Sequence, residues 1–216
     1  MVEFSRNGTT VGSIAASGGA LQVSGNTNSG LQFNSSAFVP MQNGATIDAT
    51  IDLGSSVRQF KDLYLSGGVY LGGTAAANLL DDYEEGTWTP TILSAGGGSN
   101  GSASLINCTY TKIGNRVLLT GTLLNINTTS MTAGGFRVGG LPFAAVTSSN
   151  SQNLMSLGSD RIATDEGGMY GVVSSSGTTA VIYNEVASAL RTLVNIADIT
   201  NGNGDLFISM EYQTSA

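Results

Sequence analysis

Residues 1–75 are built from very short apolar segments separated by glycine-containing turns. The segments share the order apolar, spacer, apolar, and they lie at residues 21–23, 31–33, 51–53, 63–65 and 69–71. An apolar residue at every second position places these side chains on one face of an extended strand. Pairs whose residues suit tight turns precede or separate these segments: Asn7-Gly8, Gly18-Gly19 and Asn43-Gly44. The pattern predicts short β-strands throughout this region.

Strands this short cannot enclose a hydrophobic interior within one chain. Each offers two or three inward side chains, so a region of about 75 residues buries too little apolar surface to offset the entropy lost on ordering it. The strands would also leave many backbone edges unpaired. We therefore predict that residues 1–75 form an intertwined β-shaft in an obligate oligomer. A homotrimer is the simplest symmetric arrangement that encloses a narrow apolar axis.

The composition excludes most catalytic chemistry. The chain has no histidine and a single cysteine, Cys108, which excludes a Ser-His-Asp triad, a Cys-His dyad and an internal disulfide. Charged residues make up 11% of the 216 residues, and 30 are glycine, whereas about 25% of an ordinary soluble domain is charged. We predict a non-enzymatic structural protein with no cofactor and no metal site, in which Cys108 is a buried thiol.

The charge distribution also restricts the partners. Eight Lys and Arg residues stand against 15 Asp and Glu residues, a net charge of −7. The basic residues are not clustered as phosphate binding requires, so nucleic acid is not an expected partner. No apolar run reaches the roughly 18 residues that a membrane span requires, so membrane insertion is not expected.

The composition of residues 76–87 predicts an acidic linker with one helical turn that ends at Gly86. They contain four acidic residues, Asp81, Asp82, Glu84 and Glu85. Glycosidases use two carboxylates about 5 to 10 Å apart across a cleft, whereas neighbours in a linker alternate faces. A solvated acidic collar is therefore favoured. In a trimer, a bound cation or pairing with Arg58, Lys61 or Lys112 is compatible with this arrangement.

The strand pattern of residues 88–216 predicts a C-terminal β-sandwich that resembles a jelly roll. Segments 107–113 and 116–123 flank Gly114-Asn115 and predict a hairpin with a two-residue loop. Seven more segments have strand character: 88–93, 136–138, 153–157, 169–173, 180–183, 191–194 and 206–212. Nine short strands with Gly, Asn and Ser between them are typical of a sandwich or jelly roll.

Several residues allow two interpretations. Trp88 could stack on a sugar ring, but burial in the core is favoured, and Tyr170, Tyr183 and Tyr212 share this ambiguity. Residues 198–205 carry alternating oxygen-bearing side chains that could suggest calcium. The segment lacks the glycine placement and the distal glutamate of an EF-hand, so a turn between strands is favoured.

Residues 53–72, LGSSVRQFKDLYLSGGVYLG, and residues 80–90, LDDYEEGTWTP, form two distinctive motifs. The first is similar to a segment that recurs in the fibre proteins of tailed bacteriophages, and the second resembles the segment that opens a C-terminal β-module in them. Residues 6–14, 110–117 and 140–143 match further parts. The resemblance implies a homotrimeric virion fibre or spike with an intertwined shaft and a distal β-domain that contacts the host surface.

These observations lead to one functional hypothesis and one alternative. The first is a structural virion fibre protein on the tail or capsid surface, assembled in the host cytoplasm with other virion proteins. It would contribute to attachment to host surface polysaccharide, with three weak sites acting together. Contact residues are not identifiable from the sequence, and we look for them in the loops at 96–102, 128–135, 144–151 and 174–179. The alternative is a capsid decoration or connector protein with a purely structural role.

Overall fold

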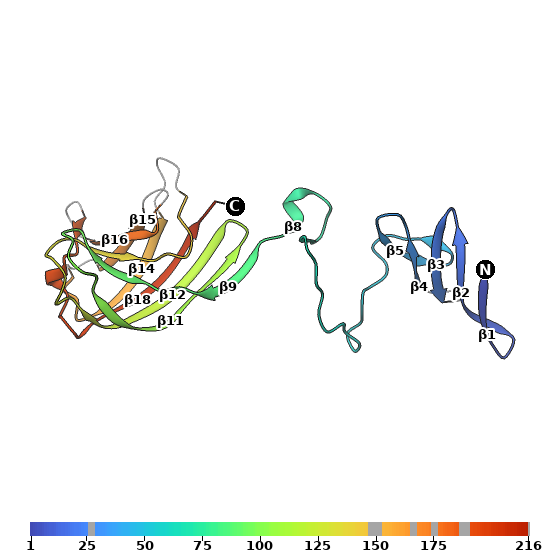
Figure 1. Ribbon diagram of the computed structural model, residues 1–216, viewed down its shortest axis with the longest axis horizontal. Helices are drawn as coiled ribbons and strands as arrows, with labels where there is room; N and C mark the ends of the chain where they lie inside the picture. Colours follow the sequence, from blue (N-terminus) through green and yellow to red (C-terminus); the bar gives the residue numbers. More distant parts are fainter. Residues whose placement is uncertain (26–28, 147–152, 165–167, 174–176, 186–190, 216) are drawn as a thin grey trace. The chain divides into compact units, whose positions relative to one another are not determined.

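The computed structural model describes residues 1–25, 29–146, 153–164, 168–173, 177–185 and 191–215 (Figure 1). Contacts within the chain divide it into two compact units, Met1–Leu65 and Ser66–Ala216. Within the described residues all sheets are antiparallel, and the helical residues form two short 3-10 turns. The all-β class predicted from the sequence is therefore confirmed.

The first unit contains a single six-stranded meander in which each strand pairs with the next along the chain. Its strands are β1 (Val2–Arg6), β2 (Thr9–Ser17), β3 (Ala20–Gly25), β4 (Ser29–Phe33), β5 (Phe38–Gln42) and β6 (Ala45–Thr46). Three of the connections are two-residue turns with positive φ at both positions: Asn7-Gly8, Gly18-Gly19 and Asn43-Gly44. This is the geometry of type I′ turns, whose twist matches that of the flanking strands.

Two predicted strands in the first unit are not formed. Residues 51–53 and 63–65 lie in irregular backbone, with one bridge between Ser55 and Arg58 as the local pairing. Leu53 and Leu63 are 74% and 65% exposed. A period-two pattern specifies which side chains share a face, but a strand also needs a partner, and these segments have none among the described residues of the chain.

The second unit contains a two-stranded ribbon and one large sheet. The ribbon pairs β7 (Val69–Tyr70) with β8 (Leu79–Leu80) around the 3-10 helix η1 (Ala76–Asn78). The large sheet has ten strands in the order β10-β13-β16-β15-β14-β18-β12-β11-β9, with β17 paired to β16. Its strands are β9 (Tyr83–Thr87), β10 (Thr91–Ser94), β11 (Ser102–Ile113), β12 (Arg116–Asn127), β13 (Phe136–Gly139), β14 (Asn153–Asp160), β15 (Met169–Val173), β16 (Thr179–Asn184), β17 (Thr192–Leu193) and β18 (Gly204–Gln213), and η2 (Ile196–Asp198) precedes β18.

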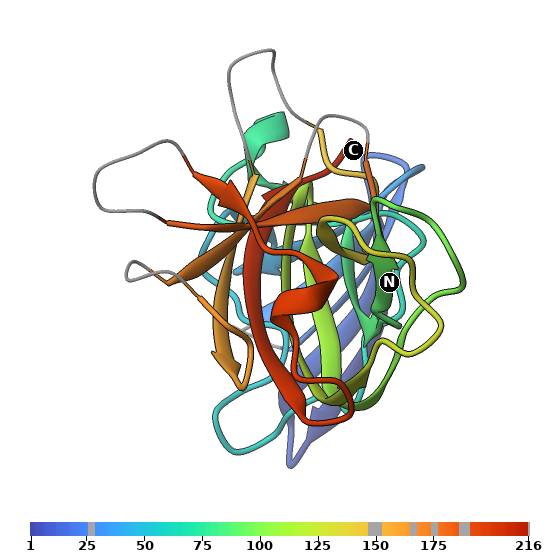
Figure 2. The same ribbon diagram turned by 90° about the vertical axis from the view of Figure 1, so that its left-hand side faces the viewer.

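The large sheet curls into a half-barrel around a hydrophobic core (Figure 2). Alternate residues of each strand point inward, as in β12, where Val117, Leu119 and Leu123 are at most 2% exposed. The curl brings β10 near the start of β11, where the Gly101 N–H donates to the Ile92 carbonyl at 3.0 Å. The hydrogen-bonded ladder runs through all ten strands as one sheet, whereas the sequence predicted a sandwich.

Two expectations for the start of this unit are corrected. The predicted helical turn ending at Gly86 is absent from the described residues 79–87, since the 3-10 turn lies earlier, at Ala76–Asn78. Residues Tyr83–Thr87 form the edge strand β9, paired with β11. Glu84 and Glu85 therefore lie in a strand and not in a linker, because pairing with a neighbouring strand outweighs their low intrinsic strand preference.

Trp88 and Cys108 are buried in the core, as predicted. The Trp88 indole Nε1–H donates to the Thr120 carbonyl at 2.8 Å. Burial raises the pKa of the Cys108 thiol, so its reactive thiolate form is disfavoured.

Candidate functional site

The first sheet has one apolar face and one polar face. Val2, Ile14, Val23, Leu31 and Pro40 lie opposite one another in a row across five strands. A second row on the same face contains Ala16, Leu21, Phe33 and Phe38. We refer to these two rows, together with Phe4 on β1, as the apolar face.

The apolar face is exposed. Val23, Leu31 and Phe38 are 41%, 46% and 72% exposed. In the first unit, the buried hydrophobic side chains among the described residues are Ala20 and Met41. The polar face carries Gln22 and Gln32, whose side-chain amides bond at 2.7 Å. Most large apolar side chains of the first sheet thus lie on one face, and no layer of the described residues covers them. Val39 and Met41 of β5 are exceptions, since they lie on the polar face opposite Gln32 and Gly30.

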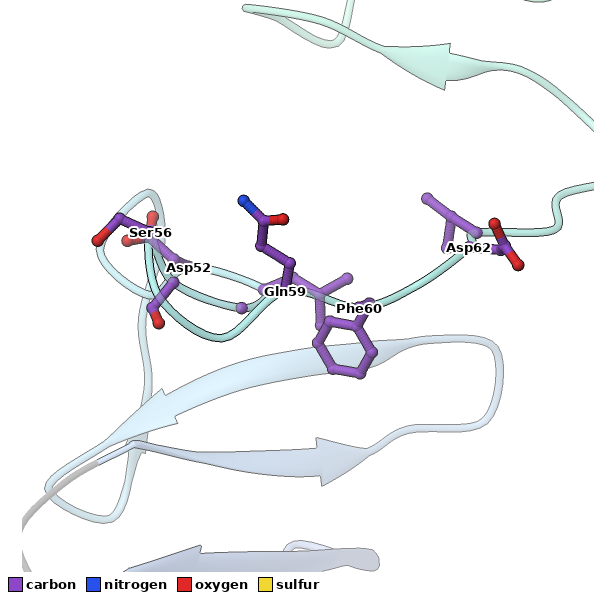
Figure 3. A pocket seen from close by; sticks show the side chains of 9 residues that line it. Asp52, Ser56, Gln59, Phe60 and Asp62 are labelled. Carbon is purple, nitrogen blue, oxygen red and sulfur yellow. The ribbon is translucent and has the colours of Figure 1, made fainter.

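A hollow of about 670 Å³ lies in the first unit after β6, lined by residues between Asp52 and Leu63 (Figure 3). Asp52 and Asp62 lie at opposite ends of it, and Gln59 and Phe60 point to opposite sides of the backbone. Phe60 is 66% exposed. Because the two carboxylates do not converge, the hollow does not have the paired arrangement that glycoside hydrolysis requires.

Asp82, Glu84 and Glu85 bond to side chains of the large sheet. Asp82 forms an ion pair with Lys112, as the sequence allowed, and the Lys112 side chain is 8% exposed. The Tyr110 hydroxyl donates to the Glu84 carboxylate, and the Tyr83 hydroxyl donates to Glu85. These carboxylates hold the pKa values of both phenols above their usual range. Asp82 and Glu84 therefore fasten the start of β9 to β11, whereas Glu85 bonds within β9. These carboxylates do not face one another across a cleft.

The loops expected to contact a ligand form two pairs. In the first pair, loop 96–102 bonds to loop 128–135: the Ser99 N–H donates to the Ser130 carbonyl, and the Thr132 N–H to the Gly97 carbonyl, both at 3.2 Å. In the second, the Ala145 N–H donates to the Gly177 carbonyl at 2.9 Å. Residues 147–151 and 174–176 of the second pair lie outside the described residues.

Segment 198–205 is a turn that supports the first loop pair. The Asn201 Oδ1 atom accepts from the Thr128 N–H at 2.7 Å, and Gly202 has φ 75°. The Asp205 carboxylate accepts from the Asn125 N–H at 2.8 Å. These oxygens therefore bond to backbone N–H groups, in agreement with the turn interpretation. Among the described residues, no group of three or more Cys, Asp or Glu is placed to hold a metal ion.

The outer face of the large sheet carries a row of hydroxyl side chains that the sequence does not reveal. Cross-strand pairing aligns Thr87, Thr109, Thr120, Ser209 and Ser156 on five adjacent strands. We refer to these five residues as the hydroxyl row. All five are exposed. The alternating Thr109, Thr111 and Thr120, Thr122 indicate polar positions on β11 and β12, but the alignment with β18 and β14 depends on the register.

Comparison of the chain with models of protein families, with curated proteins and with solved structures finds no match. No helix within the described part of the chain is long and apolar enough to cross a membrane. Support for a function therefore comes from the geometry above and from the fibre-like segments of the sequence.

Proposed function

We propose that this chain is a non-enzymatic, homotrimeric structural fibre protein of a tailed bacteriophage virion and that it contributes to attachment to host surface glycans. It would lie on the tail or capsid surface after assembly in the host cytoplasm. The observation that carries the proposal is the exposed apolar face of the first sheet. The fibre-like segments at residues 53–72 and 80–90 support the virion context.

The size of the apolar face favours a second and a third copy as its cover. From their exposed fractions, its large side chains present on the order of 700 Å² per chain, more than the few hundred Å² usual for an exposed patch and close to the roughly 800 Å² each partner buries in a standard interface. The face is neutral and self-complementary. Three copies that turn it toward a common axis form one shared core and leave the polar faces in water.

The large unit supplies the rest of the proposed fibre. Its curled sheet packs both of its ends into one core, as the two layers of a jelly-roll-like sandwich do. The chain joins the sheet at Tyr83, opposite Ile113, and the loop pair 96–102 and 128–135 lies at the other end, beside Ser102 and Asn127. That end is therefore suited to face outward from a shaft.

Sedimentation equilibrium of the full chain at micromolar concentration tests the assembly. We expect three times the 22.0 kDa mass of one chain. A folded single subunit at that concentration overturns the proposal. Adsorption of virions to host cells with and without this protein tests the attachment role, and equal adsorption contradicts it.

One observation favours a capsid decoration or connector protein as the second candidate. The outer face of the large sheet exposes Ile113, Leu118, Leu154 and Phe207, each between 44% and 58%. These apolar side chains are separated by polar residues, and such a mixed surface is compatible with contacts to another virion protein. Locating the chain on the particle by electron microscopy distinguishes a capsid position from a tail fibre.

A further inference from the structure

The hydroxyl row is a regular array of neutral hydrogen-bonding groups. Adjacent strands lie about 4.7–4.9 Å apart, which spaces the five hydroxyls evenly across the sheet. Each hydroxyl can donate one hydrogen bond and accept two. Among the described residues, the contact within the row is between the Thr109 and Thr120 hydroxyls, at 3.4 Å. Most of the bonding capacity of the row therefore faces the solvent.

The row continues into two tyrosines. Ser156 lies opposite Tyr170, and Tyr170 lies opposite Tyr183. The two rings stack with centroids 5.9 Å apart and an interplanar angle of 28°, and the Arg191 guanidinium lies 4.2 Å from the centre of the Tyr183 ring. A line of aliphatic hydroxyls thus ends at aromatic surface on the same side of the sheet.

Apolar side chains flank the row on both sides. Leu118 lies two residues from Thr120 on β12, and Phe207 lies two residues from Ser209 on β18, so both share the outer face. A small hollow of about 110 Å³ lies between Thr109, Thr111, Leu118 and Thr120. The surface therefore combines hydroxyl groups with separate apolar contacts.

We propose that this outer face binds a neutral polysaccharide that lies across the strands. A pyranose ring presents hydroxyls at its rim and C–H groups on its faces, which match the hydroxyl row and the flanking Leu118 and Phe207. The occupant is uncharged because the row consists of neutral hydroxyls, and the groups that flank it, Glu85 and the Glu211–Arg116 ion pair, carry no net positive charge to attract an anionic chain. This inference rests on the attachment half of the proposed function and moves the contact from the loops to the sheet.

The same face is less suited to a protein partner. The apolar side chains do not form one continuous patch, because hydroxyls or charges separate them: Leu118 lies between Thr111 on β11 and Glu211 on β18. Single exposed apolar residues are ordinary on protein surfaces. A polysaccharide bonds to the hydroxyls between them, whereas a protein partner would have to desolvate these groups.

Saturation-transfer NMR on the full chain tests the proposal. The probes are the methyl pyranosides of glucose, galactose and mannose, N-acetylglucosamine, dextran, mannan and, as a charged comparison, glucuronate. Monosaccharides are used at about 100 mM, which reveals millimolar dissociation constants. We expect transfer to at least one neutral probe and weaker transfer to glucuronate. No transfer to any neutral probe, or preference for glucuronate, overturns the inference.

Variants of the row identify the surface. Thr109→Val and Thr120→Val keep a β-branched side chain suited to a strand and remove one hydroxyl each. We expect about fivefold weaker binding for each, the loss typical of one hydrogen bond. Thr9→Val makes the same change at an exposed strand position of the first unit and should leave binding unchanged. Unchanged affinity in both row variants, with wild-type circular dichroism, overturns the inference.

The assembly is measured on the same samples. A trimer without affinity for neutral sugars overturns this inference alone, whereas a folded monomer that binds them through the row overturns the proposed trimer alone. If the row variants change the sedimenting mass and not sugar binding, the outer face is a protein interface and the polysaccharide assignment is wrong.

Discussion

The Lys112 ammonium group forms an ion pair with the Asp82 carboxylate at the point where the chain joins the large sheet. The two side chains differ in environment, since that of Lys112 is 8% exposed and that of Asp82 is 38% exposed. The Lys112 Nζ atom also lies 5.5 Å from the centre of the Phe143 ring. The Asp82 carbonyl accepts from the Gly114 N–H at 2.7 Å. Side chain and backbone of Asp82 together hold the start of β9 against the β11–β12 hairpin.

Because Lys112 is buried and Asp82 is partly exposed, removing one partner of the pair should destabilise the fold more than removing the other. Asp82→Asn leaves a buried ammonium without a counter-charge, so we expect it to lower the free energy of unfolding by about 2–3 kcal/mol. Lys112→Met leaves a carboxylate that water still reaches, so we expect it to lower the free energy of unfolding by only about 1 kcal/mol. Urea unfolding at fixed protein concentration measures both. Asp81→Asn, at the exposed neighbouring residue, is the control, and equal costs for the first two variants contradict the prediction.

The raised pKa of the Tyr212 phenol should make the fold lose stability in alkaline solution. Burial raises its pKa to about 12, whereas an unfolded tyrosine ionises near pH 10. The neutral phenol therefore contributes its full stabilisation below about pH 10, and this contribution is lost as the pH rises from about 10 to about 12. Tyr212→Phe should flatten this part of the stability profile.

Urea midpoints between pH 8 and pH 12 measure the effect. At pH 8 the variant should be less stable than the wild type, because the Tyr212 hydroxyl donates to the Phe143 carbonyl at 3.1 Å and accepts from its N–H at 3.2 Å. Tyr64→Phe is the control, because the Tyr64 side chain is 89% exposed. This variant should keep the pH dependence of the wild type. A Tyr212→Phe profile as steep as that of the wild type would show that another group causes the alkaline loss.

Trp88 is predicted to stabilise the large unit through packing and one hydrogen bond. A Cβ atom placed at Gly121 would lie 3.2 Å from the Trp88 ring, so the indole fills the space above that glycine. Trp88→Phe loses part of this packing and the bond to Thr120, and we expect a cost of about 2 kcal/mol. Circular dichroism is the readout, since the variant lacks the chain's single tryptophan. Phe207→Leu, at an exposed ring, should cost much less.

A charge on the apolar face should prevent self-association. Val23→Lys places an ammonium group where the proposed shared core excludes water, so we expect the sedimenting mass to fall from that of the trimer toward that of one chain. Glu3→Lys introduces the same residue on the polar face, opposite Ser13, and should leave the mass unchanged. A Val23→Lys protein that sediments like the wild type contradicts the proposed orientation of the sheet.

The strands of the second unit were largely predictable from the sequence. Burial alternates along segment 116–123 because one side of β12 faces the core, and Gly114-Asn115 marks its hairpin. The burial of Trp88 followed from its size. These features depend on local pattern and local turn chemistry, which the sequence states directly.

Features that depend on distant pairing were not predictable. The alignment of Thr120 with Ser209 joins strands far apart in sequence, so the hydroxyl row has no local signal. The pairing of β9 with β11 likewise overrides the acidic, glycine-containing composition of residues 83–87. Residues 51–53 and 63–65 show the opposite case, in which the period-two pattern is present but no partner strand exists among the residues that the structure describes.

The meander of the first unit has a consequence for how the protein matures. Its strands bond only to their immediate neighbours along the chain, a low-contact-order arrangement that forms quickly, whereas the large sheet must first bring β14 and β12 to the late strand β18. A sheet whose apolar face is uncovered buries little apolar surface. In the proposed trimer, the first unit would therefore gain most of its stability when it meets other copies, and this concentration-dependent encounter would be the slow step of assembly.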